Sequence, residues 1–358
     1  MRNPAILLPR LGQAITGIGR ALGPGLPVAA MHMSDALLSP AVGGALWAAT
    51  AGVGARAAAV VRRSGDERQV PLMGVLGAFV FAAQMVNFAI PGTGSSGHLA
   101  GGVLLAALLG PHAAFLVMAS VLTIQALFFA DGGLLALGCN IFNMGFFPAF
   151  VIHPLLFRPL AGAGAARARV LAAAVLASMV ALSLGALGVV LETAASGVSS
   201  LPLGPFLVLM LPIHTAIGVV EGLVTGLALL ALWRVRPELA VADAGRRSLR
   251  PVLMALAAVA ALTAGVLSWF ASTHPDGLEW ALARAGGGAA PAGAVHDAAA
   301  RLQARTAVLP DYTVPGGPAG PAGTSLAGLA GAGLTLLAGL GAGFVIRRLR
   351  RRPSTGSG

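Results

Sequence analysis

The sequence predicts an all-α, polytopic membrane protein with about nine transmembrane helices. Composition, the spacing of apolar segments and the placement of arginines all support this fold class. Of the 358 residues, 57% are hydrophobic and only 10% are charged, and the mean hydropathy is +0.85. A soluble domain carries about a quarter charged residues, so this chain cannot cover its surface with polar side chains. Its exterior must therefore face lipid.

Apolar segments suitable for crossing a bilayer recur along the whole chain. A bilayer core takes about 20 apolar residues per helix. The third segment is the shortest, and because Gly110 and Pro111 end it, we expect a short or tilted helix there. The nine predicted segments are residues 41–61, 70–90, 98–110, 112–130, 139–157, 168–192, 205–233, 251–271 and 322–346.

The arginines orient these segments. All 23 basic residues are arginine, and cytoplasmic connections carry the excess of positive charge. Arginine clusters follow the first, fifth, seventh and ninth segments, whereas the connections 91–97, 131–138 and 193–204 contain none. This alternation predicts a multi-pass protein of the cell membrane, with the N-terminus outside and the C-terminus inside.

The segments fall into two units after an N-terminal stretch, residues 1–30. Residues 31–239 hold seven segments with short connections, which we predict to be a seven-helix core. Residues 240–358 hold the other two segments and form a predicted two-helix accessory unit. Its stretch 285–323 is rich in Ala, Gly and Pro, which is typical of a flexible loop, here on the external side.

Composition also excludes several functions. The sequence has no lysine, so it cannot contain a P-loop of the form GxxxxGK[ST], and partner chains would have to hydrolyse any ATP that drives transport. Cys139 is the one cysteine, which excludes an intrachain disulfide and a cysteine-based zinc cluster. The net charge of +11 is explained by membrane orientation, so we expect membrane lipid and not nucleic acid as a partner.

Two of the seven histidines are predicted to meet outside the membrane. His32 follows Met31, and His98 closes a Gly- and Ser-rich connection. If the mature chain began at Met31, its amine, the His32 backbone nitrogen and the His32 imidazole could chelate one ion in fused rings, with His98 as fourth ligand. Four nitrogens in a plane suit Ni(II) or Cu(II), and Co(II) can adopt this geometry. The alternative is a helix-capping His98 and a His32 without a ligand role.

Five polar residues are candidates for supporting roles. Asp131, Asn140 and Asn143 flank an external connection, where they could hydrogen-bond the ligand imidazoles or simply cap turns and helices. His214 and Glu221 are seven residues apart and share a helix face, which fits either packing or a role in coupling and support of the site.

The element Pro275-Asp276-Gly277-Leu278-Glu279 places two acidic residues outside. These could attract cations. A Pro followed by Asp is also common where a helix begins, and we favour this structural interpretation.

Several of these motifs resemble one family. Residues 31–40 are similar to the start of CbiM/NikM proteins, the substrate-capture subunits of energy-coupling-factor importers for cobalt and nickel, and residues 272–280 resemble the PDGLE element of the NikN-type accessory subunit. The remaining matches are at residues 97–102, 125–133, 137–145, 214–225 and 234–238. The resemblance implies a non-enzymatic transport subunit that binds nickel or cobalt as cargo through the Met31 amine, His32 and His98. It also implies a transmembrane coupling subunit and ATPase subunits as partners.

Residues 1–30 depart from that pattern, because the resemblance makes the amine of Met31 a ligand. They fit a cleavable leader ending at Val28-Ala29-Ala30, a start codon assigned too far upstream, or a retained extension. The resemblance of the PDGLE-type element to the accessory subunit of the nickel system favours nickel, although imidazole and amine ligands suit both nickel and cobalt. Alternative functions are a stand-alone secondary carrier or channel, or a membrane metal sensor. A carrier would usually show paired intramembrane acids, whereas Glu192 and Glu221 are the only acids within the apolar segments.

Overall fold

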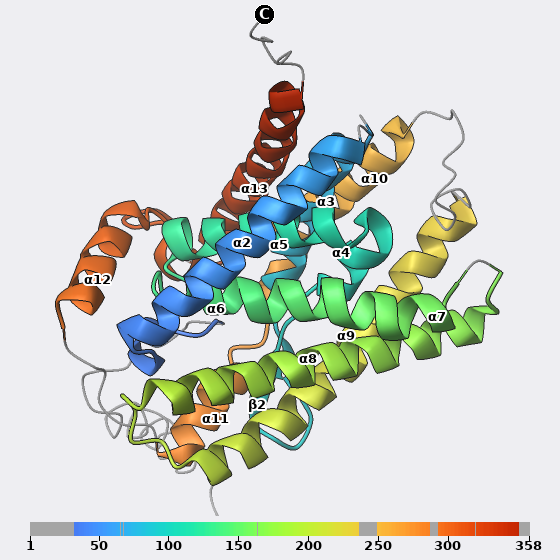
Figure 1. The fold of residues 1–358 in the computed structure, drawn as a ribbon. Helices are drawn as coiled ribbons and strands as arrows, with labels where there is room; N and C mark the ends of the chain where they lie inside the picture. Colours follow the sequence, from blue (N-terminus) through green and yellow to red (C-terminus); the bar gives the residue numbers. More distant parts are fainter. Residues whose placement is uncertain are drawn as a thin grey trace, which may run out of the picture.

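The computed structural model describes residues 32–64, 66, 68–162, 164–235, 249–286, 293–318 and 320–350. Nearly all regular structure in these ranges is helical, which confirms the all-α class (Figure 1). The first unit consists of η2 Asp35–Leu37, α2 Pro40–Ser64, α3 Gln69–Gln84, β1 Phe88–Ile90, β2 Ser95–Gly97, α4 Gly102–Leu109, α5 Pro111–Phe129, α6 Leu137–Ile141, η3 Phe142–Phe157, α7 Arg158–Leu160, α8 Arg167–Ser196 and α9 Leu203–Val235. The accessory unit consists of α10 Arg250–Gly265, η5 Leu267–Phe270, α11 Gly277–Ala285, α12 Ala294–Thr306, η6 Pro310–Tyr312 and α13 Pro321–Arg350.

Each of the nine predicted segments contains a helix, but the helices differ in length. Among the described residues, 6 helices are long and apolar enough to cross a membrane, and α3 and α10 are shorter apolar helices. The segment 98–110 holds only the eight-residue α4, which is too short to cross a membrane alone. Its first residues are non-helical, because Gly101 has a left-handed backbone (φ 78°) and ends the extended stretch that leads from β2.

One span contains a stretch of π-helix. Residues Leu137–Leu160 form a continuous helical rod in which η3 is a π-helix with Pro148 and Pro154 inside it. Proline has no N–H to donate and its ring clashes with the carbonyl one turn earlier, so the regular α-helical hydrogen-bond pattern cannot continue through these positions. The wider π-helical turns accommodate both prolines.

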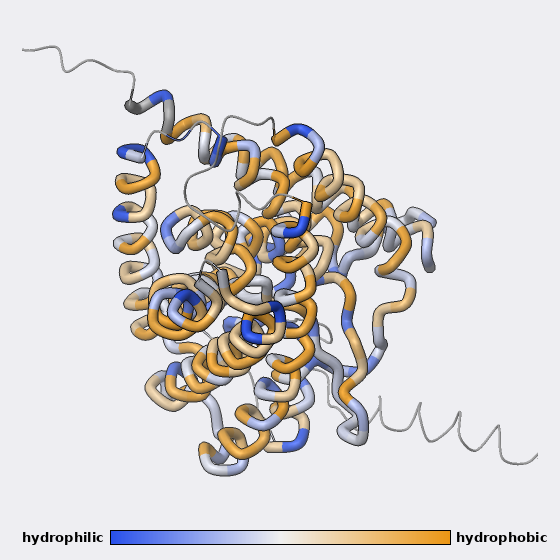
Figure 2. The backbone as a smooth tube through the Cα atoms, turned by 90° about the vertical axis from the view of Figure 1, so that its right-hand side faces the viewer, coloured by the Kyte–Doolittle hydropathy of each residue, from blue (hydrophilic) through white to orange (hydrophobic). Residues whose placement is uncertain are grey.

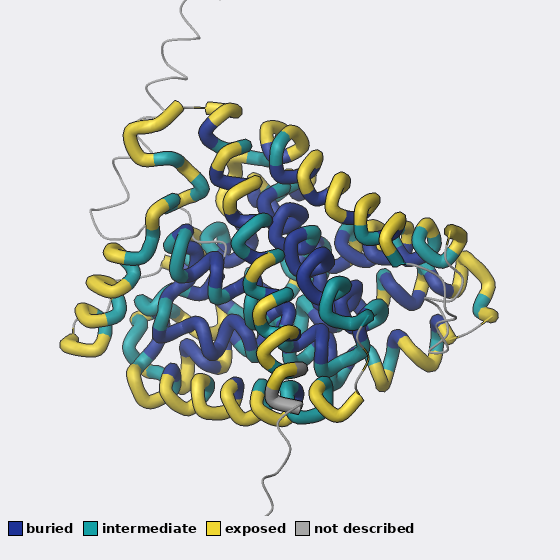
Figure 3. Tube along the Cα trace, turned by 90° about the horizontal axis from the view of Figure 1, so that it is seen from above, coloured by how far each residue is buried: buried dark blue, intermediate teal, exposed yellow. Residues whose placement is uncertain are grey.

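The outer surface of the helices is apolar. Large hydrophobic side chains such as Leu155, Met254 and Phe270 are about three-quarters exposed. Figure 2 shows hydrophobic residues along most of the helices, and Figure 3 shows buried segments gathered in the middle with exposed ones around them. An exterior of this kind is expected for a multi-pass membrane protein.

Small residues bring α8 and α9 into close contact. Gly218, Gly222 and Gly226 lie one turn apart on α9, and a Cβ at Gly222 would overlap the Val175 Cα on α8. Such small-xxx-small stripes let helix backbones approach closely in membranes. This pair crosses the lower part of Figure 1 and provides one wall of the pocket described below.

The accessory unit packs directly on the first unit. Helices α10 and α13 lie against α3, and a Cβ at Gly339 on α13 would come within 2.9 Å of the Gly74 Cα on α3. Buried Val252 and Ala327 belong to the same hydrophobic cluster as Phe81 of α3. One continuous core therefore joins the two units.

The predicted flexible loop 285–323 needs correction in its described part. Residues 294–306 form α12, which contacts α5, and η6 follows it. The Gln303 amide donates hydrogen bonds to the carbonyls of Ala126 (2.9 Å) and Gly132 (2.7 Å). These contacts order the segment because the C-terminal end of α5 and the turn after it leave main-chain carbonyls that accept them.

Candidate metal-binding pocket

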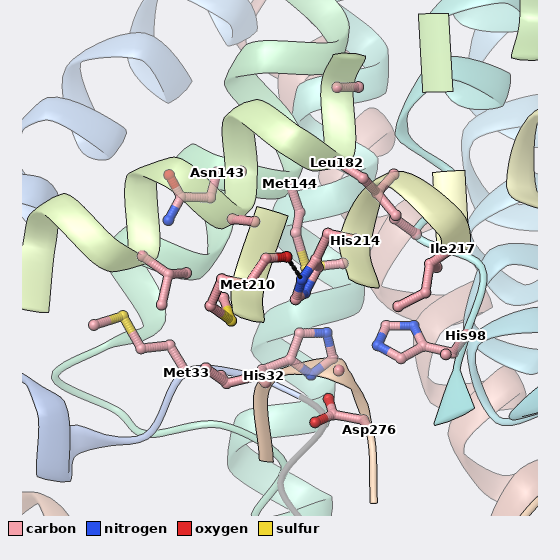
Figure 4. A pocket seen from close by; sticks show the side chains of 18 of the residues that line it. His32, Met33, His98, Asn143, Met144, Leu182, Met210, His214, Ile217 and Asp276 are labelled. Carbon is pink, nitrogen blue, oxygen red and sulfur yellow. Dashed lines mark hydrogen bonds between the residues drawn. The ribbon is translucent and has the colours of Figure 1, made fainter. Parts of the chain in front are cut away.

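A pocket between the two units gathers most of the polar residues singled out from the sequence. It is lined from α6, η3, α8, α9, α11 and the two connections that carry the candidate histidines (Figure 4). Its polar lining residues are His32, His98, Asn140, Asn143, His214, Glu221 and Asp276. The predicted ligand Met31 lies outside the described residues.

His32 is buried and held by a chain of hydrogen bonds. Its Nδ1 lies 3.0 Å from Oδ1 of Asp131, and the Tyr312 hydroxyl donates to Oδ2 of the same carboxylate at 2.6 Å. The His32 Nε2 is buried and has no hydrogen-bond partner among the described residues. This nitrogen is therefore a donor atom available to a ligand.

The observed ring orientation differs from the predicted chelate. A fused ring with the His32 backbone nitrogen needs Nδ1, whereas Nδ1 is engaged by Asp131 in the structure. Metal binding through Nδ1 would require that nitrogen to leave Asp131. Binding through Nε2 would keep Asp131 as the partner that orients the ring, as carboxylates often do for ligating histidines.

The pKa values of Asp131 and Asp276, the two carboxyl groups in this part of the structure, are shifted in opposite directions. Burial alone would raise the pKa of Asp131, but the neighbouring His32 and the Tyr312 hydroxyl outweigh it, so the pKa is lower than usual. Burial raises the pKa of Asp276 well above its ordinary value, and the nearby Glu279 and Asp131 raise it further. Asp131 is thus a stable anion beside the imidazole.

The segment that carries His32 is fixed by main-chain contacts. The Asn140 amide donates to the Met33 carbonyl at 3.0 Å, and its oxygen accepts from the Met33 N–H at 3.1 Å. Gly133 N–H also donates to the Met33 carbonyl, and Oδ1 of Asp35 accepts from Ala136 N–H at 2.8 Å. Asn140 therefore supports the site by anchoring the backbone next to His32, not by contacting an imidazole.

His98 approaches from the opposite direction. The β1–β2 hairpin ends at Gly97, and the extended residues that follow place the His98 ring 5.5 Å from the His32 ring, centroid to centroid, at 55°. The His98 Nδ1 lies 3.3 Å from the Leu99 carbonyl. The structure therefore brings the two candidate imidazoles together, although 66 positions separate them in the sequence.

Glu221 holds the non-helical stretch after His98. Its carboxylate is 1% exposed and accepts hydrogen bonds from the N–H groups of Ala100 (2.8 Å) and Gly101 (3.2 Å). These donors precede α4, whose N-terminus carries unpaired N–H groups and a partial positive charge. Glu221 therefore fixes the backbone that leads from His98 to α4.

His214 and Asn143 line the pocket but have other partners. The His214 Nδ1 lies 2.8 Å from the Met210 carbonyl one turn earlier. The Asn143 amide donates to the Glu192 carboxylate at 3.0 and 3.2 Å. Both side chains shape the wall of the pocket.

Two more residues contact the site from the accessory unit, Tyr312 and Asp276. Tyr312, the only tyrosine of the chain, contacts Asp131 from 181 positions away, and no local pattern marks such a contact. Asp276 caps α11 as favoured, since its Oδ1 accepts from Glu279 N–H at 2.8 Å, and it also lines the pocket. No group of three or more His, Cys, Asp or Glu side chains in the described ranges is arranged to hold a metal. A metal site here therefore needs ligands beyond such a cluster.

Comparison with known proteins relates both units to transport proteins. The family profile "Cobalt uptake substrate-specific transmembrane region" (CbiM) matches residues 32–239, and the PDGLE domain profile matches residues 250–348. A putative fused nickel transport protein NikMN of Archaeoglobus fulgidus is 34% identical over 327 residues, covering 90% of this chain and 99% of that protein. The fused nickel transport protein NikMN of Rhodobacter capsulatus is 32% identical over 347 residues, with the same coverage. A crystal structure described as a transition metal transporter is 32% identical, with a TM-score of 0.51, and matches 57% of this chain and 94% of that one.

Proposed function

The chain belongs to the CbiM family, with a fused PDGLE unit of the NikN type, and on this premise we propose that it is the substrate-capture subunit of an energy-coupling-factor importer for nickel. It is a multi-pass membrane protein of nickel and cobalt transport. Three further points belong to the proposal: capture at the outer face, coupling to ATPase partners, and the choice of nickel.

One observation carries the proposal: two imidazoles from distant segments meet in a pocket between the units. The His32 and His98 rings lie 5.5 Å apart, and the buried His32 Nε2 has no partner among the described residues. A buried polar atom without a partner is costly and uncommon in proteins, and it is explained if a ligand completes it. Imidazole nitrogens suit nickel and cobalt.

The proposed ligands are the Met31 amine, His32 and His98. A free amine at Met31 would allow the fused chelate, in which His32 binds through Nδ1 and leaves Asp131. A peptide-linked Met31 would leave the His32 Nε2 as the donor atom. The processing state of residues 1–30 therefore determines which nitrogen of His32 binds.

Transport requires partners in this proposal. The chain has no lysine and hence no P-loop, so ATPase subunits and a transmembrane coupling subunit supply the energy. The arginine distribution supports an N-terminus and a pocket at the outer face. Movement of the helix bundle by the partners would release the ion inward. The PDGLE-type unit supports nickel, because the two fused relatives described above, which match 90% of the chain, are named as nickel transport proteins.

Uptake of radioactive nickel by cells that express the chain with its partner subunits tests the proposal. His98→Ala should abolish accumulation, whereas His112→Ala should not, because His112 packs on Phe150 away from the pocket. Unchanged uptake by the His98→Ala variant would refute the site. Uptake that persists without the ATPases would favour the secondary carrier or channel, and binding without accumulation would favour a sensor. Stronger competition by cobalt than by nickel would reverse the choice of metal.

Mass spectrometry of the N-terminus of the protein purified from its membrane is the first measurement to make. A chain that begins at Met31 would support the fused chelate. A retained residue 1 would exclude the amine as a ligand and leave His32 and His98 with ligands of another kind.

A further inference from the structure

Tyr312 of the accessory unit is held against the C-terminal end of α5. Its ring stacks on Phe129 at 4.8 Å, centroid to centroid, and 24°. The Leu309 N–H donates to the Phe128 carbonyl at 3.0 Å, which ties η6 to the same end of the helix. Asp311 and Tyr312 both have left-handed backbones, with φ of 51° and 55°. Such a backbone is unfavourable for residues with a Cβ, so these contacts must offset its cost.

The contact between Tyr312 and Asp131 determines which nitrogen of His32 carries hydrogen. The Tyr312 hydroxyl donates to Oδ2 of Asp131 at 2.6 Å, and Oδ1 of the same group lies 3.0 Å from His32 Nδ1. A carboxylate can accept hydrogen bonds but has none to donate, so Nδ1 must be the donor. A neutral imidazole with its hydrogen on Nδ1 has its lone pair on Nε2.

This arrangement turns Nε2 of His32 toward the pocket. Nε2 is buried and has no hydrogen-bond partner among the described residues. Figure 4 shows the His32 and His98 rings side by side in the pocket. A Cβ at Gly132 would come within 2.9 Å of the His32 Cβ, so the segment after Asp131 packs directly against His32. The ring is therefore fixed both by packing and by its hydrogen bond.

Packing on α5 does not account for the hydroxyl of Tyr312. A phenylalanine would stack on Phe129 equally well. The Asp131 carboxylate, however, is 2% exposed, and burying a charged group is costly unless hydrogen bonds compensate it. His32 and Tyr312 each donate one such bond, so the hydroxyl keeps Asp131 in the form that accepts from His32.

We propose that Tyr312 is a positioning residue for His32, which acts through Asp131 to hold the ring with Nε2 facing the pocket, where it receives the ion. This inference rests on the proposed function and specifies the nitrogen through which His32 binds. Loss of a partner that orients a ligating histidine typically weakens metal binding by about 10- to 100-fold. Tyr312 acts one hydrogen bond further away, so we expect a smaller loss, of about three- to tenfold.

Nitrogen NMR of the metal-free full-length protein in detergent, with isotopically labelled histidine, is the first test. The spectrum of His32→Ala identifies the signals of His32. Wild type should have hydrogen on Nδ1 of His32, whereas Tyr312→Phe should show a mixture of the two neutral tautomers. Trp269→Phe is the matched control, because it removes an aromatic donor of the accessory unit that binds Ser325 Oγ at 2.7 Å, and Trp269 is not among the residues lining the pocket. It should leave the His32 signals unchanged.

Titration calorimetry with Ni(II) is the second test. Tyr312→Phe should bind about three- to tenfold more weakly, and Trp269→Phe should stay within about twofold of wild type. Asp131→Asn is a second variant that should show the same mixture of tautomers and bind about 10- to 100-fold more weakly. Adding Tyr312→Phe to Asp131→Asn should weaken binding no further, because the hydroxyl acts through that carboxylate.

Three results would overturn the inference. The first is an unchanged His32 tautomer in both Tyr312→Phe and Asp131→Asn, and the second is wild-type affinity in Tyr312→Phe. The third is stronger binding by Tyr312→Phe, because it would assign the ligand role to Nδ1 and make Asp131 a competitor of the ion. All three would leave the proposed function standing, whereas unchanged binding in His98→Ala would refute the proposed function itself.

Discussion

Glu221→Gln should weaken metal binding without contact between residue 221 and the ion. In the structure both carboxylate oxygens accept main-chain N–H groups, one from Ala100 and one from Gly101, at 2.8 and 3.2 Å. A glutamine offers one acceptor oxygen and one NH₂ group. In either orientation, one of the two N–H groups faces another donor.

The size of the effect follows from that mismatch. A hydrogen bond to a charged group contributes about 1.5–3 kcal/mol, and a buried N–H without a partner costs about 1–3 kcal/mol. The stretch that carries His98 would move to avoid this cost. If about 1.4–2.7 kcal/mol of this cost is subtracted from the free energy of Ni(II) binding, the affinity for Ni(II) falls by about 10- to 100-fold.

Titration calorimetry with Ni(II) on the purified variants measures this change. Glu192→Gln is the matched control, because Glu192 is also a buried acid on a long helix but accepts from side chains, the Asn143 amide and the Cys139 thiol, and glutamine can retain the bond to Asn143. Its affinity should be close to that of wild type. Wild-type affinity in Glu221→Gln would refute the reasoning, and equal losses in both variants would show a general effect of removing buried acids.

Three further predictions concern stability. Tyr312→Phe removes the hydroxyl that donates to Asp131 but keeps the ring stacked on Phe129 (4.8 Å, 24°), so it should lower the free energy of unfolding by about 1.5–3 kcal/mol, measured as a lower thermal midpoint in detergent. The pKa of Asp131 is lower in the folded protein than usual, so its contribution to the free energy of unfolding should be present at neutral pH and lost as the pH falls through the folded pKa. The difference in thermal midpoint between wild type and Asp131→Asn should therefore shrink at acid pH, and a constant difference would contradict this. Gly101→Ala should cost about 1–2 kcal/mol from its positive φ, with an added clash against Val80, whereas the same change at Gly44, where a Cβ meets open space, should be tolerated.

The helices and the histidine pair could be predicted because both follow from the bilayer. An apolar run of membrane length must form a helix to satisfy its backbone, and arginine asymmetry places His32 and His98 on the same side. The sequence does not predict that helix α4 begins only at Gly102, because Gly101 and Gly102 also fit the small residues of a membrane helix. Residues 98–101 are non-helical, and this leaves the N–H groups of Ala100 and Gly101 free to donate to Glu221.

The contribution of the accessory unit could not be predicted from local patterns. Helix α12 lies in a stretch whose Gly and Pro content is typical of a loop, although its alanines are strong helix formers. The contact between Tyr312 and Asp131 depends on packing of α12 and η6 against α5, and sequence periodicity carries no information on such a long-range contact. The orientation of the His32 ring depends on the same contact.

The hydrogen bonds between the two units also have a consequence for assembly. Asp276 lines the pocket and Tyr312 donates to Asp131, the partner of His32, from the same polypeptide that carries His32, so each pocket has one accessory unit at the high effective concentration of a tethered partner. Separate chains would have to associate first, and the fraction of pockets that have an accessory unit would then vary with the amount of each chain in the membrane. Fusion makes the stoichiometry one to one and independent of expression level.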